Sequence, residues 1–141
     1  MNHLLSPGDR AFRTEFEACT FPPAGFDHRA HIRLAYTYLC EQDTETAYES
    51  VRRALLSFLE HHGVEISKYH DTITRAWIMA VRHFMEITPG SASADEFIGQ
   101  NPRMLDAKIM MTHYSAELLF SDAARRGFVE PDLDPIPRYE E

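Results

Sequence analysis

The chain has few cysteines and glycines, no long apolar run and no excess of positive charge. Its 141 residues include two cysteines and six glycines, and its formal net charge is -8 at pH 7. Nucleic acids and anionic membrane surfaces bind basic faces, so the acidic balance argues against both as partners. No stretch approaches the roughly 20 apolar residues that a membrane-spanning helix needs. We therefore expect neither a nucleic-acid-binding protein nor a membrane protein.

Several short motifs are also missing. Cys19 and Cys40 lack the paired spacing of a zinc knuckle or a redox motif, and two free thiols are a simpler interpretation than one disulfide. Residues 1–10 contain no apolar run that would indicate a signal peptide, so a cytoplasmic protein is expected. The sequence contains no GxGxxG and no P-loop, and no glycines flank Ser115 as they would a hydrolase nucleophile. Nothing here indicates a nucleotide-binding site or a serine hydrolase.

Apolar residues recur at helical spacing, whereas the strict alternation of a β-strand is almost absent. The pattern predicts an all-α fold, a compact bundle of four main helices in one domain covering residues 1–141. The predicted main helices cover about residues 8–18, 28–41, 44–62 and 70–88. Short C-terminal helices are predicted at about residues 93–98, 103–111, 115–120 and 122–127, before an extended Pro-rich tail over residues 131–137.

Residues that favour helix ends support these boundaries. Asp27 is a good N-cap for the second main helix, and Gly63 suits the end of the third. Ser93 and Ser121 suit the starts of two short helices. Among the histidines outside the helix starts, His3 is expected to face solvent.

Two segments place histidines at the starts of core helices. The first is Phe26-Asp27-His28-Arg29-Ala30-His31, and the second is Tyr69-His70-Asp71-Thr72-Ile73-Thr74. His28 and His31 are three residues apart, so they share one helix face. His70 begins another helix and is predicted to face its apolar side. If these two helices run in the same direction, as the second and fourth helices of an up-down bundle do, the three rings converge.

Such a cluster favours neutral imidazole, the form that binds metals and acts as a general base. The helix dipole opposes positive charge at an N-terminus, and burial has the same effect. Three histidine ligands with an open position are typical of a catalytic metal site, and two histidines with a carboxylate are typical of non-haem iron. We therefore predict that His28, His31 and His70 bind a divalent metal ion, with iron, zinc and copper all left open.

Residues beside His70 are candidates for catalysis. Asp71 is predicted to orient a ring or to act as a base, and Tyr69 could supply a hydroxyl group. Thr72 and Thr74 could form hydrogen bonds to a ligand. The alternative interpretation is that the histidines and Asp71 are hydrogen-bonded core or capping residues.

The two histidine segments also carry a resemblance, together with Leu34-Ala35, Lys68, Asn101-Pro102, Tyr114-Ser115, Ala124-Arg125 and Pro131-Asp132-Leu133. With these residues the chain resembles a family of small bacterial all-helical proteins to which no reaction is assigned. That family usually carries Glu where this chain has Asp71, so the carboxylate is kept but its reach is shorter. The resemblance implies a single compact domain whose signature is the two histidine segments.

Together these features predict a metal-dependent or acid–base enzyme that acts on a small molecule. One alternative is a non-catalytic module that binds a metal or a small-molecule ligand. Another is a structural interaction domain in which the histidines form hydrogen bonds within the core.

Overall fold

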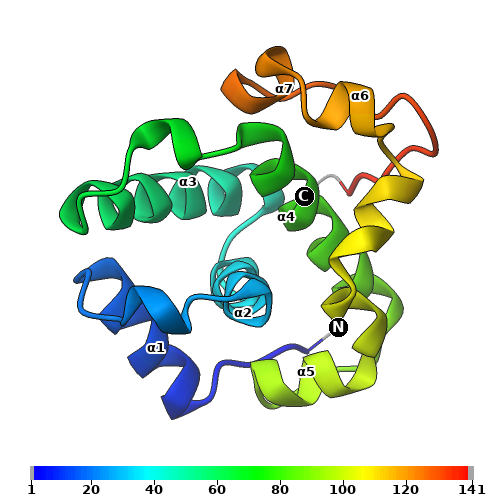
Figure 1. The fold of residues 1–141 in the computed structure, drawn as a ribbon. Helices are drawn as coiled ribbons and strands as arrows, with labels where there is room; N and C mark the ends of the chain where they lie inside the picture. The colour runs from blue at the N-terminus through cyan, green and yellow to red at the C-terminus, as the bar shows by residue number, and fades with distance from the viewer. Residues whose placement is uncertain (1, 140–141) are drawn as a thin grey trace.

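A computed structural model describes residues 2–139 and shows an all-α fold (Figure 1). Within this range the only β pairing is a parallel bridge between His3 and Ser91. The α-helices are α1 (Pro7–Glu17), α2 (His28–Leu39), α3 (Thr44–His61), α4 (Asp71–Ile87), α5 (Ala94–Gln100), α6 (Ala116–Leu119) and α7 (Asp122–Arg126). The 3₁₀ helices are η1 (Pro23–Gly25), η2 (Ile66–Lys68), η3 (Pro102–Leu105) and η4 (Ala107–Thr112). None of the helices in residues 2–139 is long and apolar enough to cross a membrane.

The four predicted main helices and the short C-terminal helices are confirmed, with one difference in detail. The single helix expected over residues 103–111 is two 3₁₀ segments, η3 and η4. Asp106 separates them because its backbone is extended, and its carboxylate accepts a hydrogen bond from the Lys108 backbone N–H at 3.0 Å. A side chain that satisfies a backbone donor in this way competes with helix formation.

The predicted helix caps are confirmed as well. Asp27 accepts a hydrogen bond from the backbone N–H of Ala30 at 2.9 Å, and this contact fixes the start of α2. Ser93 and Ser121 cap α5 and α7 in the same way. Gly63 follows α3 with a φ of 69°, a left-handed conformation that glycine adopts without steric cost.

Helix α2 is the centre of the molecule. It contacts α1, α3, α4 and α5, and Figure 1 shows it end-on with these helices around it. Its residues from Leu34 to Leu39 are all buried, because neighbours cover every side of this half of the helix. The N-terminal turns of α2 are less enclosed, and the candidate site lies there.

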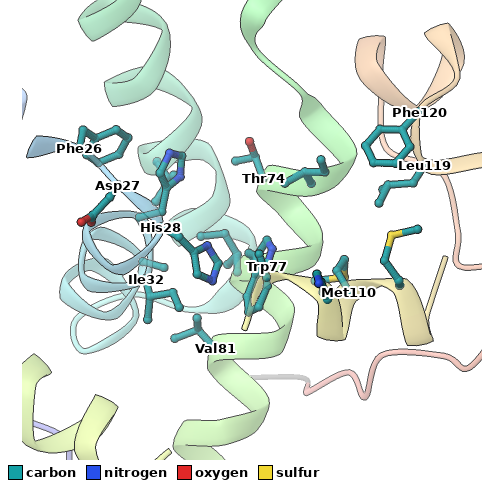
Figure 2. A pocket seen from close by; sticks show the side chains of 18 residues that line it. Phe26, Asp27, His28, Ile32, Thr74, Trp77, Val81, Met110, Leu119 and Phe120 are labelled. Atoms are coloured by element: carbon teal, nitrogen blue, oxygen red, sulfur yellow. The ribbon is translucent and has the colours of Figure 1, made fainter. Parts of the chain in front are cut away.

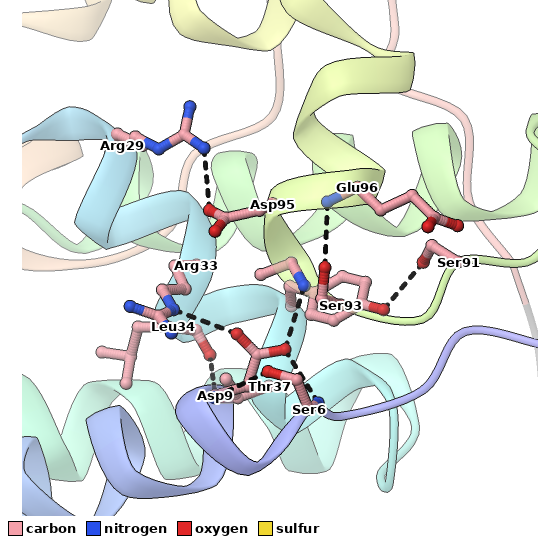
Figure 3. Close-up of polar contacts among 12 residues, drawn as sticks. Ser6, Asp9, Arg29, Arg33, Leu34, Thr37, Ser91, Ser93, Asp95 and Glu96 are labelled. Atoms are coloured by element: carbon pink, nitrogen blue, oxygen red, sulfur yellow. Dashed lines mark hydrogen bonds and ion pairs between the residues drawn. The ribbon is translucent and has the colours of Figure 1, made fainter.

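A buried carboxylate joins α1, α2 and α5 (Figure 3). Asp9 is 1% exposed and accepts hydrogen bonds from the Arg33 guanidinium at 3.1 Å, the Ser6 backbone at 3.1 Å and the Ala94 backbone at 2.9 Å. Burial raises the pKa of Asp9, but these donors outweigh it and hold the pKa below its usual value. The contacts make Asp9 a structural anchor for three helices.

The expectation that His3 faces solvent is wrong. His3 is buried, with its ring nitrogens 2.7 Å from the Ser91 hydroxyl and 2.7 Å from the Met85 carbonyl oxygen. Tyr36 extends this network, because its hydroxyl lies 2.8 Å from the Ser91 hydroxyl and donates to the Leu4 carbonyl at 2.7 Å. The N-terminal segment is thereby held against the end of α4.

The C-terminal segment is extended, as its prolines predict, and it packs on the body of the fold. Ile136 is buried in an apolar cluster with residues of α4, η4 and α6. The backbone N–H of Leu133 donates to the His113 carbonyl at 2.9 Å. Trp77 packs against both this cluster and the larger core around α2, so α4 connects the two apolar regions.

Candidate functional site

A pocket of about 510 Å³ lies between α2, α4, η4 and the end of α6 (Figure 2). Pockets that bind small molecules and cofactors commonly measure about 300–1,000 Å³. Most of the lining side chains are apolar, among them Ile32, Val81, Met110 and Leu119. The polar lining residues are Asp27, His28, His31, Thr74 and Lys108.

The position of α2 along α4 creates this space. The His28 and Trp77 rings pack in a T-shaped arrangement, with 4.7 Å between centroids. Trp77 lies seven residues beyond His70, which at 1.5 Å per residue is about 10 Å along the axis of α4. The first turn of α2 therefore lies beside the middle of α4 rather than beside its start.

His28 has a defined tautomer. Its Nε2 lies 2.8 Å from the Met104 carbonyl oxygen, which can only accept a hydrogen bond. Nε2 therefore carries a proton and donates it to this carbonyl. His28 makes no other hydrogen bond within residues 2–139. The contact with η3 thus orients a ring whose second nitrogen has no protein partner within the described residues.

His31 has no hydrogen bond to another residue of the described chain. Its ring packs on Phe26 at 4.2 Å between centroids, and the residue is exposed to solvent and lines the pocket. The surrounding protein atoms displace water and lower the pKa of His31 to about 4, and repulsion from His28 adds to this effect. Asp27 opposes the shift but does not cancel it. His31 is therefore a neutral imidazole at pH 7.

Two more polar groups lie at the pocket without a protein partner in the described range. Trp77 is half-buried, and its indole N–H makes no hydrogen bond to another residue. Lys108 is exposed on η4, and its ammonium group forms no ion pair. Thr74 differs, because its hydroxyl donates to the His70 carbonyl at 2.8 Å.

His70 does not join the other two histidines. It is the N-cap of α4, where Nδ1 accepts a hydrogen bond from the Ile73 backbone N–H at 3.1 Å. Its Nε2 lies 2.7 Å from the Leu119 carbonyl oxygen, so Nε2 donates to the last turn of α6. Both ring nitrogens are thus used by backbone groups, and His70 does not line the pocket. This geometry corrects the predicted convergence of three rings and matches the alternative of a capping residue.

Asp71 and Tyr69 belong to a separate cluster around the buried Asp71 carboxylate. The Asp71 carboxylate accepts hydrogen bonds from the hydroxyls of Tyr48 at 2.6 Å and Tyr69 at 2.7 Å, and the Arg52 guanidinium lies 3.7 Å away. Burial and the Asp71 carboxylate raise the pKa of both tyrosines, to about 12 for Tyr48. Neither Asp71 nor Tyr69 lines the pocket. The predicted catalytic pair therefore connects α3 and α4 instead of contacting the pocket histidines.

Thr72 is also structural. It is fully buried, and its hydroxyl donates to the Gly127 carbonyl at 3.0 Å and accepts from the Val129 backbone N–H at 3.1 Å. These bonds attach the chain after α7 to the first turn of α4. They hold the chain after α7 against the start of α4, where α7 packs on α4.

No group of three or more His, Cys, Asp or Glu side chains in residues 2–139 is arranged to hold a metal ion. The predicted ligand set of His28, His31 and His70 is therefore not assembled. His28 and His31 remain together in the pocket, as their spacing predicts. Lys108 could not be singled out from the sequence, because it lies among apolar residues of η4 with no motif around it.

Comparison of the chain with protein-family models, curated proteins and solved structures gave no match. The resemblance to a bacterial helical family thus stays a prediction.

Proposed function

We propose that this chain binds a small, largely apolar molecule in the pocket between α2 and α4, with His31 as the hydrogen-bond partner of its polar group. The pocket volume of about 510 Å³ and the mostly apolar walls support a compact organic ligand. Burial of apolar ligand surface would supply most of the affinity, at about 25 cal/mol per Å².

The observation that carries the proposal is the free imidazole of His31 in an apolar pocket. His3 and His70 each use both ring nitrogens within the protein. His31 lines the pocket and uses neither. Because His31 is exposed at the pocket, water or a ligand can satisfy both ring nitrogens, and a ligand that enters can take the place of the water.

The pKa of His31 favours binding over acid–base catalysis. A general base works best when its pKa lies near the working pH. With a pKa of about 4, His31 is a weak base at pH 7, although it can still donate or accept a hydrogen bond. The non-catalytic binding module is therefore preferred to the acid–base enzyme.

The single tryptophan of the chain, Trp77, lines the pocket, so its fluorescence can report ligand binding there. N-phenylnaphthylamine is a small apolar dye that becomes fluorescent in apolar surroundings and accepts energy from tryptophan. Titration of the dye should give saturable binding near one dye per chain, with energy transfer from Trp77. Dye fluorescence without saturation, or without transfer from Trp77, would refute the proposal.

A pair of variants locates the bound dye. Ala35 lines the pocket from α2, so Ala35→Phe places a ring in the cavity and should reduce dye affinity at least tenfold. Ala123→Phe adds the same ring to an exposed position of α7 outside the pocket and should leave affinity unchanged. Circular dichroism establishes that both variants keep their helices.

A second candidate is a divalent metal ion held by His28 and His31. Histidines that bind metals usually donate their other ring N–H to a carbonyl or carboxylate, and His28 donates Nε2–H to Met104 in this manner. The neutral state of His31 also suits a ligand. Water would have to complete the coordination, since no third protein ligand is grouped with them in the described residues.

Titration of untagged protein with Cu²⁺ or Zn²⁺ tests this candidate. A bound ion should be lost in His28→Ala and in His31→Ala and kept in His70→Ala, the matched control outside the pocket. Binding that depends on His70, or no stoichiometric binding, would eliminate the candidate.

A further inference from the structure

We infer that the ligand is a carboxylic acid with an apolar body, and that Lys108 selects its negative charge. This inference rests on the proposed function and names the class of molecule that the pocket takes. Lys108 lies on η4, across the pocket from the histidines of α2, and its ammonium group has no ion-pair partner within residues 2–139.

The unpaired polar groups of the pocket are mainly hydrogen-bond donors. The indole N–H of Trp77 and the ammonium of Lys108 can only donate, and neutral His31 offers one N–H beside one acceptor nitrogen. A ligand group that satisfies several donors must be rich in acceptors. A carboxylate has two oxygens that accept and no donor, and its charge complements Lys108.

The one acidic residue of the lining does not cancel this preference. The Asp27 carboxylate caps α2 through the Ala30 backbone N–H at 2.9 Å, and Figure 2 shows it directed away from Trp77. The N-terminus of α2, twelve residues long, also presents the positive end of its dipole at this side of the pocket.

The rim of the pocket fits an amphiphile. Phe120 lines the pocket and is 62% exposed, so an apolar surface continues outward beside the cavity. Lys108 is also exposed, which places the charged end of a ligand near solvent while the apolar body fills the interior.

The negative net charge of the chain would by itself disfavour a carboxylate ligand. The chain carries a net charge of -8, which repels anions at long range. An uncharged alcohol is also more hydrophobic than the carboxylate of equal length, so an apolar cavity without Lys108 would favour the alcohol. Preference for the acid must therefore come from a local contact.

The test compares decanoate and decanol, each below its aggregation concentration, as competitors of bound N-phenylnaphthylamine in the full chain. Decanoate should displace the dye at a concentration about fivefold lower than decanol at low salt. Added salt should weaken decanoate and leave decanol unchanged. Lys108→Gln should abolish the preference, whereas Lys68→Gln, which changes the only other lysine, should keep it.

The outcomes separate the two proposals. If the dye binds but decanol competes as well as decanoate, or if Lys108→Gln keeps the preference, this inference is overturned and the proposed function stands. If the dye does not bind at all, the proposed function fails and the inference fails with it. Because Lys108 is exposed, Lys108→Gln should have the same thermal unfolding midpoint as the wild type. If the midpoints agree, the lost preference for decanoate is due to the missing charge and not to a loss of stability.

Discussion

The ring of His70 donates from Nε2 to the carbonyl oxygen of Leu119 at 2.7 Å, and this bond ties the start of α4 to the end of α6. The same ring accepts from the Ile73 backbone N–H. A side chain so engaged holds two helices in place and has no nitrogen left for a ligand. The separation of His70 from the pocket follows from these bonds and from the offset of α2 along α4.

Replacing His70 should cost stability without affecting the pocket. His70→Ala removes the N-cap and the bond to Leu119, and should lower the free energy of unfolding by about 1–3 kcal/mol. His70→Asn keeps a capping acceptor and should cost less. Urea unfolding measures both, and dye binding at low urea should match the wild type. A His70→Ala protein with unchanged stability and lost dye binding would contradict this account.

The pH dependence of stability should report His31. Its pKa is about 4 in the folded protein and 6.5 when unperturbed, so between these values the unfolded chain takes up a proton that the folded chain does not. Stability should therefore be complete above pH 6.5 and fall as the pH decreases from 6.5 towards 4. His70 has a lowered pKa too, mainly from burial, and contributes in the same direction.

Urea midpoints across this pH range, for the wild type and His31→Gln, isolate the contribution of His31. The curve of the variant should be flatter below pH 6.5. Parallel curves would show that His31 titrates normally in the folded state.

The Asp71 cluster should behave as a structural unit. Tyr48 and Tyr69 both donate to the same carboxylate, so Tyr48→Phe and Tyr69→Phe should each cost about 1–3 kcal/mol. The double variant should differ from the sum of the two, because the two hydroxyls share one partner. Ligand affinity should not change in any of the three. A loss of affinity with unaltered stability would return Tyr69 to a catalytic or binding role.

Thr72 should hold the C-terminal segment on α4. Thr72→Val keeps the shape of the side chain but leaves the Gly127 carbonyl and the Val129 N–H without their partner. Amide hydrogen exchange should then increase over residues 127–139 while α2 and α3 stay protected. Thr20→Val, at an exposed position near α1, is the control and should leave exchange in this segment as it is.

Much of the fold could be predicted from the sequence, because helix signals are local. Asp27, Ser93 and Ser121 cap the helices as expected, and α2 and α4 begin within one residue of their predicted starts. The split between η3 and η4 was not predicted, since it depends on the Asp106 carboxylate bonding to the Lys108 backbone.

The site was predictable only in part. The shared face of His28 and His31 follows from their spacing within one helix. The place of His70 depends on how far α2 is shifted along α4 and on which backbone carbonyl its ring meets, and both are set by tertiary packing. Lys108 carries no sequence signal, because its role depends on the pocket that three distant segments form.

The most direct test of ligand binding in the pocket is the nuclear magnetic resonance signal of the single indole N–H, that of Trp77. On addition of decanoate this signal should shift saturably, together with backbone signals of the first turns of α2, the middle of α4 and η4. A Trp77 signal that stays unchanged at saturating decanoate, or shifts confined to other parts of the chain, would contradict the account.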